Sequence, residues 1–350
     1  NAEDAVISKV GDLCYSGFVP RNLNAVIDVC EKNAGIKLVD EQRSTIELLF
    51  QNNLLILTGG PGTGKTQTVK IVVDVFETLG YKDIILCTPT GRAARVLSDI
   101  TGHEAVTIHR LLNIQPGQNP EFNSQNPLRC DLIVVDEIGM VDIILAYQLL
   151  GAISCHSKVL LVGDKNQLPS IGPGNVLMDM LAAKVPNVNL TKIFRQSEGS
   201  SIAYNAHKIN RGEMLDFKNS KDFYYISQNE PEKVLDLVKK SYLRLLEKGF
   251  SVIDIQVLAP MKKGATGTQN LNKILQETIN PPTGQKKSVV HGSTVFRVRD
   301  KVMQIKNNYE KQVFNGEVGV IVRIDPIFDD DGNEIESIGV YVKFNGQEIV

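Results

Sequence analysis

The feature that most constrains this chain is a glycine-rich turn, Gly59-Gly60-Pro61-Gly62-Thr63-Gly64-Lys65-Thr66. It follows the apolar run 54–57 and precedes apolar residues with helical spacing over 69–79, which predicts a strand, a turn and a helix. Glycines let several backbone N–H groups point at one anion, and the start of the helix adds its positive dipole. Lys65 would contact the outer phosphates and Thr66 would contact Mg²⁺. The pattern predicts a nucleoside triphosphate site.

Composition limits the alternatives. A chain of 350 residues is long enough for two or three domains, and 42% hydrophobic with 22% charged residues is ordinary for a globular protein. Because the net charge is −2, a surface for nucleic acid would have to be a local groove. There is no long apolar segment and no signal peptide, which favours a cytoplasmic location and no membrane contact. The five cysteines stand far apart, as reduced thiols do, and predict neither a zinc nor an iron–sulfur site.

An acidic pair follows a second apolar run. Residues 132–135 predict a buried strand that ends in Asp136-Glu137. In a site with a phosphate loop, Asp136 would hold Mg²⁺, and Glu137 would orient and deprotonate the attacking water. A strand expected at 159–162 brings Gln167 to the same sheet edge, where it could contact the terminal phosphate. Arg195, just after another short apolar stretch, could act as an arginine finger.

Three further positions each allow two interpretations. Gln42 lies in the first turn of a helix expected to begin near Asp40. Its amide could pair with adenine, although an ordinary surface glutamine is favoured on spacing alone. The loop 88–94 opens a helix after a strand at 84–87, so Thr90 and Arg92 could meet a nucleic-acid phosphate, or Arg92 could simply be solvated. On its own, His109 would be structural.

Taken together and in order, the motifs resemble those of a known family. They are GGPGTGKT, TPTGRAA, TIHRLL, VVDEIGMVD, VGDKNQLPSIGPGN and LTKIFRQ. This set resembles superfamily 1 DNA helicases, and within them the RecD-like branch, whose members move from the five-prime to the three-prime end of a single strand. The resemblance covers about 37–350. It implies an α/β fold with a P-loop RecA-like parallel sheet domain, a second RecA-like domain and an inserted SH3-like β-barrel.

The resemblance also assigns roles, residue by residue. It implies that Gln42 reads adenine, and that a set of polar residues hydrolyses ATP with Mg²⁺: Lys65, Thr66, Asp136, Glu137, Gln167 and Arg195. Thr90, Arg92 and His109 fall in motifs that contact or flank the single strand. One departure is Ile138-Gly139, where relatives usually carry Ala-Ser, so the local packing there is open.

These features suggest a division of the chain. We expect a helical appendage at 1–36, the first RecA-like domain at 37–212, the first part of a second one at 213–285, and the SH3-like insertion at 286–350. The second RecA-like part should contain a helix over 234–246, a strand at 252–258 and a helix over 271–279. Lys262, just after that strand, could touch a DNA phosphate or be solvated.

The insertion and one loop carry weaker signals. Strands are expected at 301–306, 318–322 and 338–342, and three hairpin turn pairs lie between or after them: Asn315-Gly316, Asp331-Gly332 and Asn345-Gly346. Residues 113–128, rich in Asn, Gln and Pro, predict an inserted loop. It could be a wedge that separates DNA strands, although a disordered surface loop is favoured.

The functional expectation is ATP-dependent translocation on single-stranded DNA with unwinding at duplex junctions. Two rivals stay open: a phosphotransferase acting on a small molecule, and an ATP-dependent nucleic-acid clamp or subunit without helicase activity of its own. In the resembling family, two further motor motifs follow the barrel. Because this sequence stops at Val350, within the expected barrel, we expect these 350 residues alone to be a nearly inert fragment.

Overall fold

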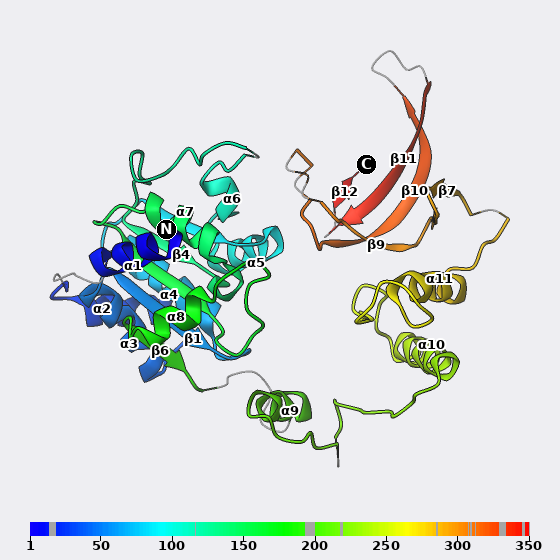
Figure 1. The fold of residues 1–350 in the computed structure, drawn as a ribbon, viewed down its shortest axis with the longest axis horizontal. Coiled ribbons are helices and arrows are strands. Elements are labelled where there is room, and N and C mark those ends of the chain that lie inside the picture. The colour runs from blue at the N-terminus through cyan, green and yellow to red at the C-terminus, as the bar shows by residue number, and fades with distance from the viewer. Residues whose placement is uncertain are drawn as a thin grey trace. The chain divides into compact units, whose positions relative to one another are not determined.

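The fold is taken from a computed structural model that describes most of the chain. The described residues are 1–13, 19–115, 117–192, 200–217, 220–284, 286–306, 308, 310–311, 313–328, 334–344 and 347–349. They form two compact units, 1–224 and 225–350, whose elements are labelled in Figure 1. None of the described helices is long and apolar enough to span a bilayer.

The first unit is built around a parallel sheet. Its six described strands lie in the order β3-β2-β4-β5-β1-β6. Their bounds are β1 Leu54–Gly59, β2 Ile84–Thr88, β3 Ala105–Thr107, β4 Leu132–Val135, β5 Lys158–Gly163 and β6 Asn187–Leu190. Every pairing between them is parallel, with Leu54 opposite Val159 and Gly59 opposite Leu190. The apolar runs expected as strands at 54–57, 84–87, 132–135 and 159–162 are therefore confirmed.

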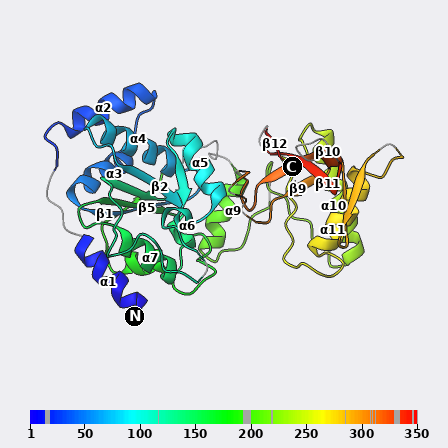
Figure 2. The same ribbon diagram turned by 90° about the horizontal axis from the view of Figure 1, so that it is seen from above.

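Helices cover both faces of this sheet. Figure 2 shows α2 and α4 on one side and α1 and α7 on the other. The helices of the unit are α1 Ala2–Leu13, α2 Leu23–Ala34, α3 Asp40–Gln51, α4 Lys65–Thr78, α5 Gly91–Thr101, α6 Ile108–Leu111, α7 Ile143–Ala152, α8 Val176–Ala182 and α9 Ser201–Asn210, with a 3₁₀ turn η1 at Ile138–Met140. A parallel sheet has to be covered in this way because its strands are apolar on both faces.

Alternation along each strand separates two cores. Leu55 and Leu57 of β1 belong to one buried cluster, with side chains of α2, α3 and α4, whereas Leu54 and Ile56 belong to the other, with side chains of α1, α7 and α8. All four side chains are completely buried. This follows from the two-residue period of a strand, in which neighbouring side chains point to opposite faces.

The two N-terminal helices are part of these cores. Leu13 of α1 is fully buried in the cluster that includes α7, and Ile27 of α2 is fully buried in the cluster that includes α4. The segment 1–36, expected as an appendage, thus supplies one helix to each face of the sheet. The apolar stripe of α2 at Leu23, Val26, Ile27 and Cys30 has helical spacing and is buried along its length.

The second unit combines two helices with antiparallel strands. They are α10 Pro231–Glu247, α11 Thr268–Ile279, β7 Ser288–His291, β8 Thr294–Arg297, β9 Lys301–Met303, β10 Val318–Phe328, β11 Glu334–Phe344 and β12 Gln347–Ile349. The described strands pair as a four-stranded sheet, β12-β11-β10-β9, and a hairpin, β7-β8. The expected helices are confirmed, and the strand expected at 301–306 ends at Met303.

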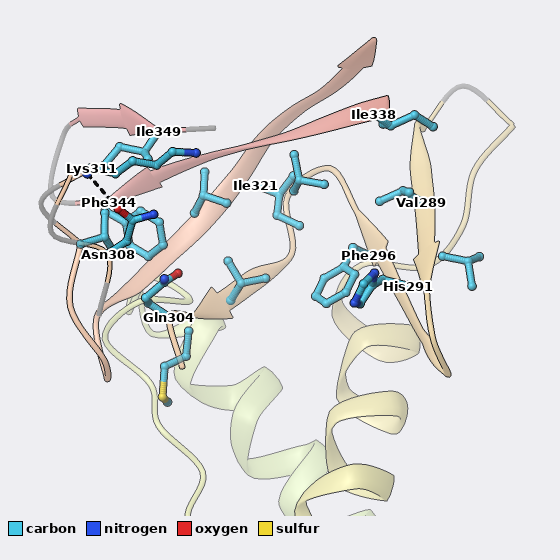
Figure 3. A pocket seen from close by; sticks show the side chains of 16 residues that line it. Val289, His291, Phe296, Gln304, Asn308, Lys311, Ile321, Ile338, Phe344 and Ile349 are labelled. Atoms are coloured by element: carbon cyan, nitrogen blue, oxygen red, sulfur yellow. Dashed lines mark hydrogen bonds between the residues drawn. The ribbon is translucent and has the colours of Figure 1, made fainter. Parts of the chain in front are cut away.

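The two antiparallel sheets share an interior. Side chains of both line a cavity of about 470 Å³, among them Val289 and Phe296 from the hairpin and Ile321 and Phe344 from the larger sheet (Figure 3). Facing apolar surfaces on short curved strands are what an SH3-like fold requires. Of the expected turn pairs, Gly316 adopts a φ of 90° two residues before β10; 331–332 and 345–346 lie outside the described residues.

The strand expected at 252–258 is wrong. The chain turns at 252–254 and continues to 259 without strand pairing. Asp254 accepts hydrogen bonds from both the N–H and the hydroxyl of Ser251, and such local bonds compete with extended backbone. The carbonyl of Ile255 accepts from the ammonium of Lys301 at 2.5 Å. Both described sheets of this unit are antiparallel, so the apolar run finds no parallel partner there.

Candidate nucleotide and nucleic-acid site

The expected site residues gather at one edge of the sheet in unit 1. Because β1, β4 and β5 are parallel neighbours, the loops that follow them leave from the same edge. Those loops carry Lys65, Asp136-Glu137 and Gln167 respectively. The next neighbours along the edge, β2 and β3, lead to Thr90 and His109. The topology thus brings phosphate-facing and strand-facing candidates to adjacent loops.

The phosphate loop has the backbone that its glycines predict. Gly62 and Gly64 have φ values of 78° and 83°, in the left-handed region that side chains disfavour. The hydroxyl of Thr63 donates to the carbonyl of Gly60 at 2.9 Å and holds the loop closed. A Cβ on Gly59 would lie 2.6 Å from that hydroxyl, so only glycine fits. Helix α4 then begins at Lys65, with its N–H groups directed into the loop.

Lys65 lies over its own loop. Its ammonium donates to the carbonyls of Gly59 at 2.7 Å and Gly60 at 3.1 Å. The positive charge of Lys65 therefore already lies at the phosphate loop that would receive the outer phosphates. A phosphate entering this loop offers the same ammonium an anionic acceptor, which forms the stronger hydrogen bond.

The acidic pair is strained and partly desolvated. Asp136 is 9% exposed, and burial raises the pKa of its carboxyl to about 6, although the N–H of Glu137 and the ammonium of Lys65 act in the opposite direction. That N–H donates to Asp136 Oδ1 at 2.8 Å. Glu137 itself has a φ of 56°, a strained value for a residue other than glycine. A buried carboxylate beside the lysine suits a divalent cation, since hard oxygen ligands are what Mg²⁺ prefers.

The departure at Ile138-Gly139 has a structural compensation. Ile138 is buried, and it packs where a Cβ on Gly163 would lie 2.9 Å from its Cγ2 atom. Gly163 is the last residue of β5, next to β4. The larger side chain at 138 is thus accommodated because position 163 has none, and the backbone after β5 comes close to η1.

The loop after β5 is held to α7. Asp164 is buried and accepts the N–H of Asn166 at 2.9 Å, while Gln167 projects exposed from the loop. Gly172 lies so close to Asp142 that a Cβ there would stand 2.1 Å from its carboxylate. Sequence reasoning missed this contact, for which the glycines around Pro173 were the only signal.

Gln42 is the candidate for the base. It lies in the first turn of α3 and is 3% exposed, so the ordinary surface glutamine favoured on spacing alone is wrong. Its Oε1 atom accepts the backbone N–H of Val39 at 3.1 Å, which fixes the direction of the amide. An amide oxygen has two lone pairs, so it can accept a second hydrogen bond, and Nε2 can donate to a base.

The candidates for the nucleic-acid strand are on the surface. Thr90 is the N-cap of α5, with its hydroxyl accepting the N–H of Ala93 at 3.3 Å. Arg92 in the first turn of α5 and His109 in α6 are exposed. Thr90 thus has a local structural use besides any contact with a ligand, whereas Arg92 and His109 project from the edge that carries the P-loop.

Two expected residues lie outside the described part of unit 1. Arg195 lies outside the described residues. Lys262 is exposed in unit 2, in a bend before α11, where its carbonyl accepts the N–H of Gln269 at 3.1 Å.

The loop 113–128 is organised by its own amides. Asn123 Oδ1 accepts the N–H groups of Gln125 and Asn126, and Asn126 donates to the carbonyl of Glu121. Phe122 packs against one core. Its described residues therefore form a folded surface loop with an apolar anchor.

Both units contain segments that match known protein families. Residues 42–173 match the AAA domain model, and 271–344 match the SH3 domain of ATP-dependent RecD-like DNA helicases. The chain is 37% identical to an ATP-dependent RecD2 DNA helicase of Deinococcus radiodurans over 311 residues, covering 88% of this chain and 42% of the relative. It is 30% identical to the RecBCD enzyme subunit RecD of Mycobacterium tuberculosis, covering 81% and 55%. The chain thus spans about half the length of these relatives.

A solved structure supports the fold. The chain resembles, with a TM-score of 0.51 and 19% identity, a structure described as "Structural Basis for DNA Unwinding at Forked dsDNA by two coordinating Pif1 helicases", covering 90% of this chain and 76% of that one. The P-loop at the edge of a parallel sheet, the SH3 match and the identity to RecD proteins together place this chain in the RecD-like helicase family.

Proposed function

We propose that this chain belongs to an ATP-driven motor that moves along single-stranded DNA from the five-prime to the three-prime end and unwinds duplex junctions. The observation that carries the proposal is the single edge of the unit 1 sheet. It presents the phosphate loop and the acidic pair beside the exposed Arg92 and His109. ATP chemistry and a strand contact on adjacent loops are what coupling between them requires.

The residues present fit ATP and Mg²⁺. Lys65 and the N–H groups at the start of α4 would hold the outer phosphates, and Gln42 the adenine. The hydroxyl of Thr66 and the buried carboxylate of Asp136 would hold Mg²⁺, which when bound neutralises charge on the phosphate oxygens.

Hydrolysis would then depend on Glu137. Its carboxylate accepts a proton from a water molecule as the water oxygen attacks the terminal phosphorus and the bond to ADP breaks. Gln167, exposed at the same edge, would contact the terminal phosphate, and Arg195 would stabilise the charge that develops on it. The acidic pair Asp136-Glu137 and Gln167 favour water as the acceptor of the phosphoryl group over a small molecule.

The wider setting belongs to the proposal too. The direction of movement follows from the family resemblance. A cytoplasmic location is proposed, with single-stranded DNA and duplex junctions as partners and Lys262 as a further phosphate contact. We also propose that residues 1–350 alone hydrolyse ATP slowly, because every described candidate for the ATP phosphates lies in unit 1 and none in unit 2.

The central test is ATP hydrolysis by this chain with and without single-stranded DNA. We expect slow turnover that single-stranded DNA stimulates. Glu137→Gln should retain nucleotide binding and lose turnover by about a hundredfold or more, whereas Lys65→Ala should lose both. Gln42→Ala should weaken ATP more than GTP. DNA-independent turnover, or equal loss of binding in the Glu137 and Lys65 variants, would contradict the proposal.

A second test addresses the strand. Arg92→Ala should lower single-stranded DNA affinity and reduce the slope of log affinity against log salt by about one, because one phosphate contact is lost. Arg129, exposed before β4 at the opposite sheet edge, offers a matched control, and Arg129→Ala should leave the slope unchanged. His109→Ala should lower affinity without changing nucleotide binding. Equal slopes in both arginine variants would exclude Arg92 as a phosphate contact.

A further inference from the structure

One carboxylate joins two parts of unit 1 that are distant in sequence. Both oxygens of Glu41, in the first turn of α3, accept hydrogen bonds from Thr191: Oε2 from its N–H at 2.8 Å and Oε1 from its hydroxyl at 2.5 Å. The two residues are 150 positions apart. A carboxylate that engages both a backbone and a side-chain donor of one residue fixes direction as well as distance.

Thr191 stands directly beside the phosphate loop. It follows Leu190, the last residue of β6, which lies opposite Gly59 in the parallel register. A Cβ on Gly59 would be only 3.0 Å from Cβ of Leu190, so the ends of the two strands touch. Because Glu41 is bonded to Thr191, Glu41 is also held at a set distance from the loop that would receive the phosphates.

On the other side of the contact is the candidate for the base. Gln42 is the next residue after Glu41, with its amide already directed by the bond to Val39. The hydroxyl and N–H of Thr191, in that order, hold the pKa of the Glu41 carboxyl below its usual range, so it is charged. A negative charge in the first turn is also favoured by the helix dipole.

We propose that Glu41 is a positioning residue that fixes the adenine-facing turn of α3 to the end of β6, and so sets the preference of the site for adenine over guanine. The inference rests on the proposed nucleotide site. No pattern in the sequence indicated it, because the two residues meet only in the fold.

The contact is better suited to alignment than to stability. The hydrogen bonds between Glu41 and Thr191 are exposed, and exposed charged contacts contribute little to the free energy of unfolding. A hydrogen bond between Gln42 and a base, in contrast, weakens steeply once its geometry departs from a narrow range. A small displacement of the turn would therefore lower the affinity for adenine nucleotides relative to guanine nucleotides, while phosphate binding stays intact.

The experiment measures the affinities of fluorescent mant-ATP and mant-GTP, each with Mg²⁺, for the 350-residue chain. Glu41→Gln and Thr191→Val should each weaken mant-ATP by up to about tenfold, the effect of losing one neutral hydrogen bond between Gln42 and the base, and leave mant-GTP nearly unchanged. Thr191→Ser keeps both donors and should retain the preference. The double variant should lose no more than the worse single one, because both changes remove the same contact.

Asp40 provides the matched control. It is an exposed acid in the same turn, so Asp40→Asn removes the same charge from the helix dipole and should leave the preference unchanged. Equal losses in the Asp40 and Glu41 variants, equal weakening of both nucleotides, or an unchanged preference in Glu41→Gln would each overturn the inference alone. A wild-type chain that binds neither nucleotide would instead overturn the proposed function, and the inference with it.

Discussion

The two units differ in how firmly their strands are buried. In unit 1, the strands β1 and β4 are buried at every residue, with helices on both faces. In unit 2, β7 is mostly exposed, and the cluster between α10 and α11 is built on Tyr242, Ile255 and Leu275. The candidate chemistry lies on the first unit. A sheet covered on both faces fixes the loops at its edge, and phosphoryl transfer depends on such fixed positions.

The largest expected difference between the two units comes from replacing one lysine in each. Lys65→Ala should weaken mant-ATP binding by about a hundredfold, because the outer phosphates lose their cation within the loop. Lys262→Ala, in unit 2, should leave that affinity unchanged and lower only the affinity for single-stranded DNA. Comparable losses of nucleotide affinity would show that the site is not confined to the sheet edge.

A pair of core truncations compares the two interiors. Leu161 is fully buried in β5, and Leu161→Ala should lower the free energy of unfolding by about 4 kcal/mol. Leu275 is 9% exposed in α11, and Leu275→Ala should cost about 2 kcal/mol, since a looser site can collapse around the cavity. Urea unfolding followed by circular dichroism, with one transition for each unit, measures both. Equal costs would contradict the difference in packing.

The smallest expected effects test the close contact between Ile138 and Gly163. Gly163→Ala should cost about 2 kcal/mol because the new methyl group meets Ile138 in a packed core. Gly151, within α7, has open space where a Cβ would stand, so Gly151→Ala should be neutral or stabilise by about 1 kcal/mol. Adding Ile138→Ala removes the Cγ2 atom that the new methyl group meets, so this change should cost less in the Gly163→Ala background than in the wild-type chain. Thermal unfolding checks all three, and equal effects of the two glycine changes would refute the contact.

Much of unit 1 could be predicted because its signals are local. The run 132–135 is apolar at every residue and is followed by Asp136, so both the strand and its end could be read from the sequence. The phosphate loop depends on glycines whose φ values are the ones that the motif requires. The left-handed backbone of Glu137 could not be predicted, because glutamate has no preference for a positive φ.

What could not be predicted depends on distant partners. The run 252–258 is as apolar as a strand, but a strand also needs a neighbour. Here Asp254 bonds locally to Ser251, and Lys301 occupies the carbonyl of Ile255. Likewise, the contact between Glu41 and Thr191 joins residues 150 positions apart. Residue spacing predicts helices and strands, whereas contacts between distant residues can be recognised only once the order of strands in the sheet is known.

Hydrogen exchange with and without AMP-PNP and Mg²⁺ tests the central claim, that the nucleotide site is at the sheet edge of unit 1. The account predicts that nucleotide slows exchange most at 59–66, and also around 39–43 and 136–137. Exchange within the SH3-like strands at 288–303 should be unchanged. Protection confined to unit 2, or none at 59–66 under saturating nucleotide, would contradict it.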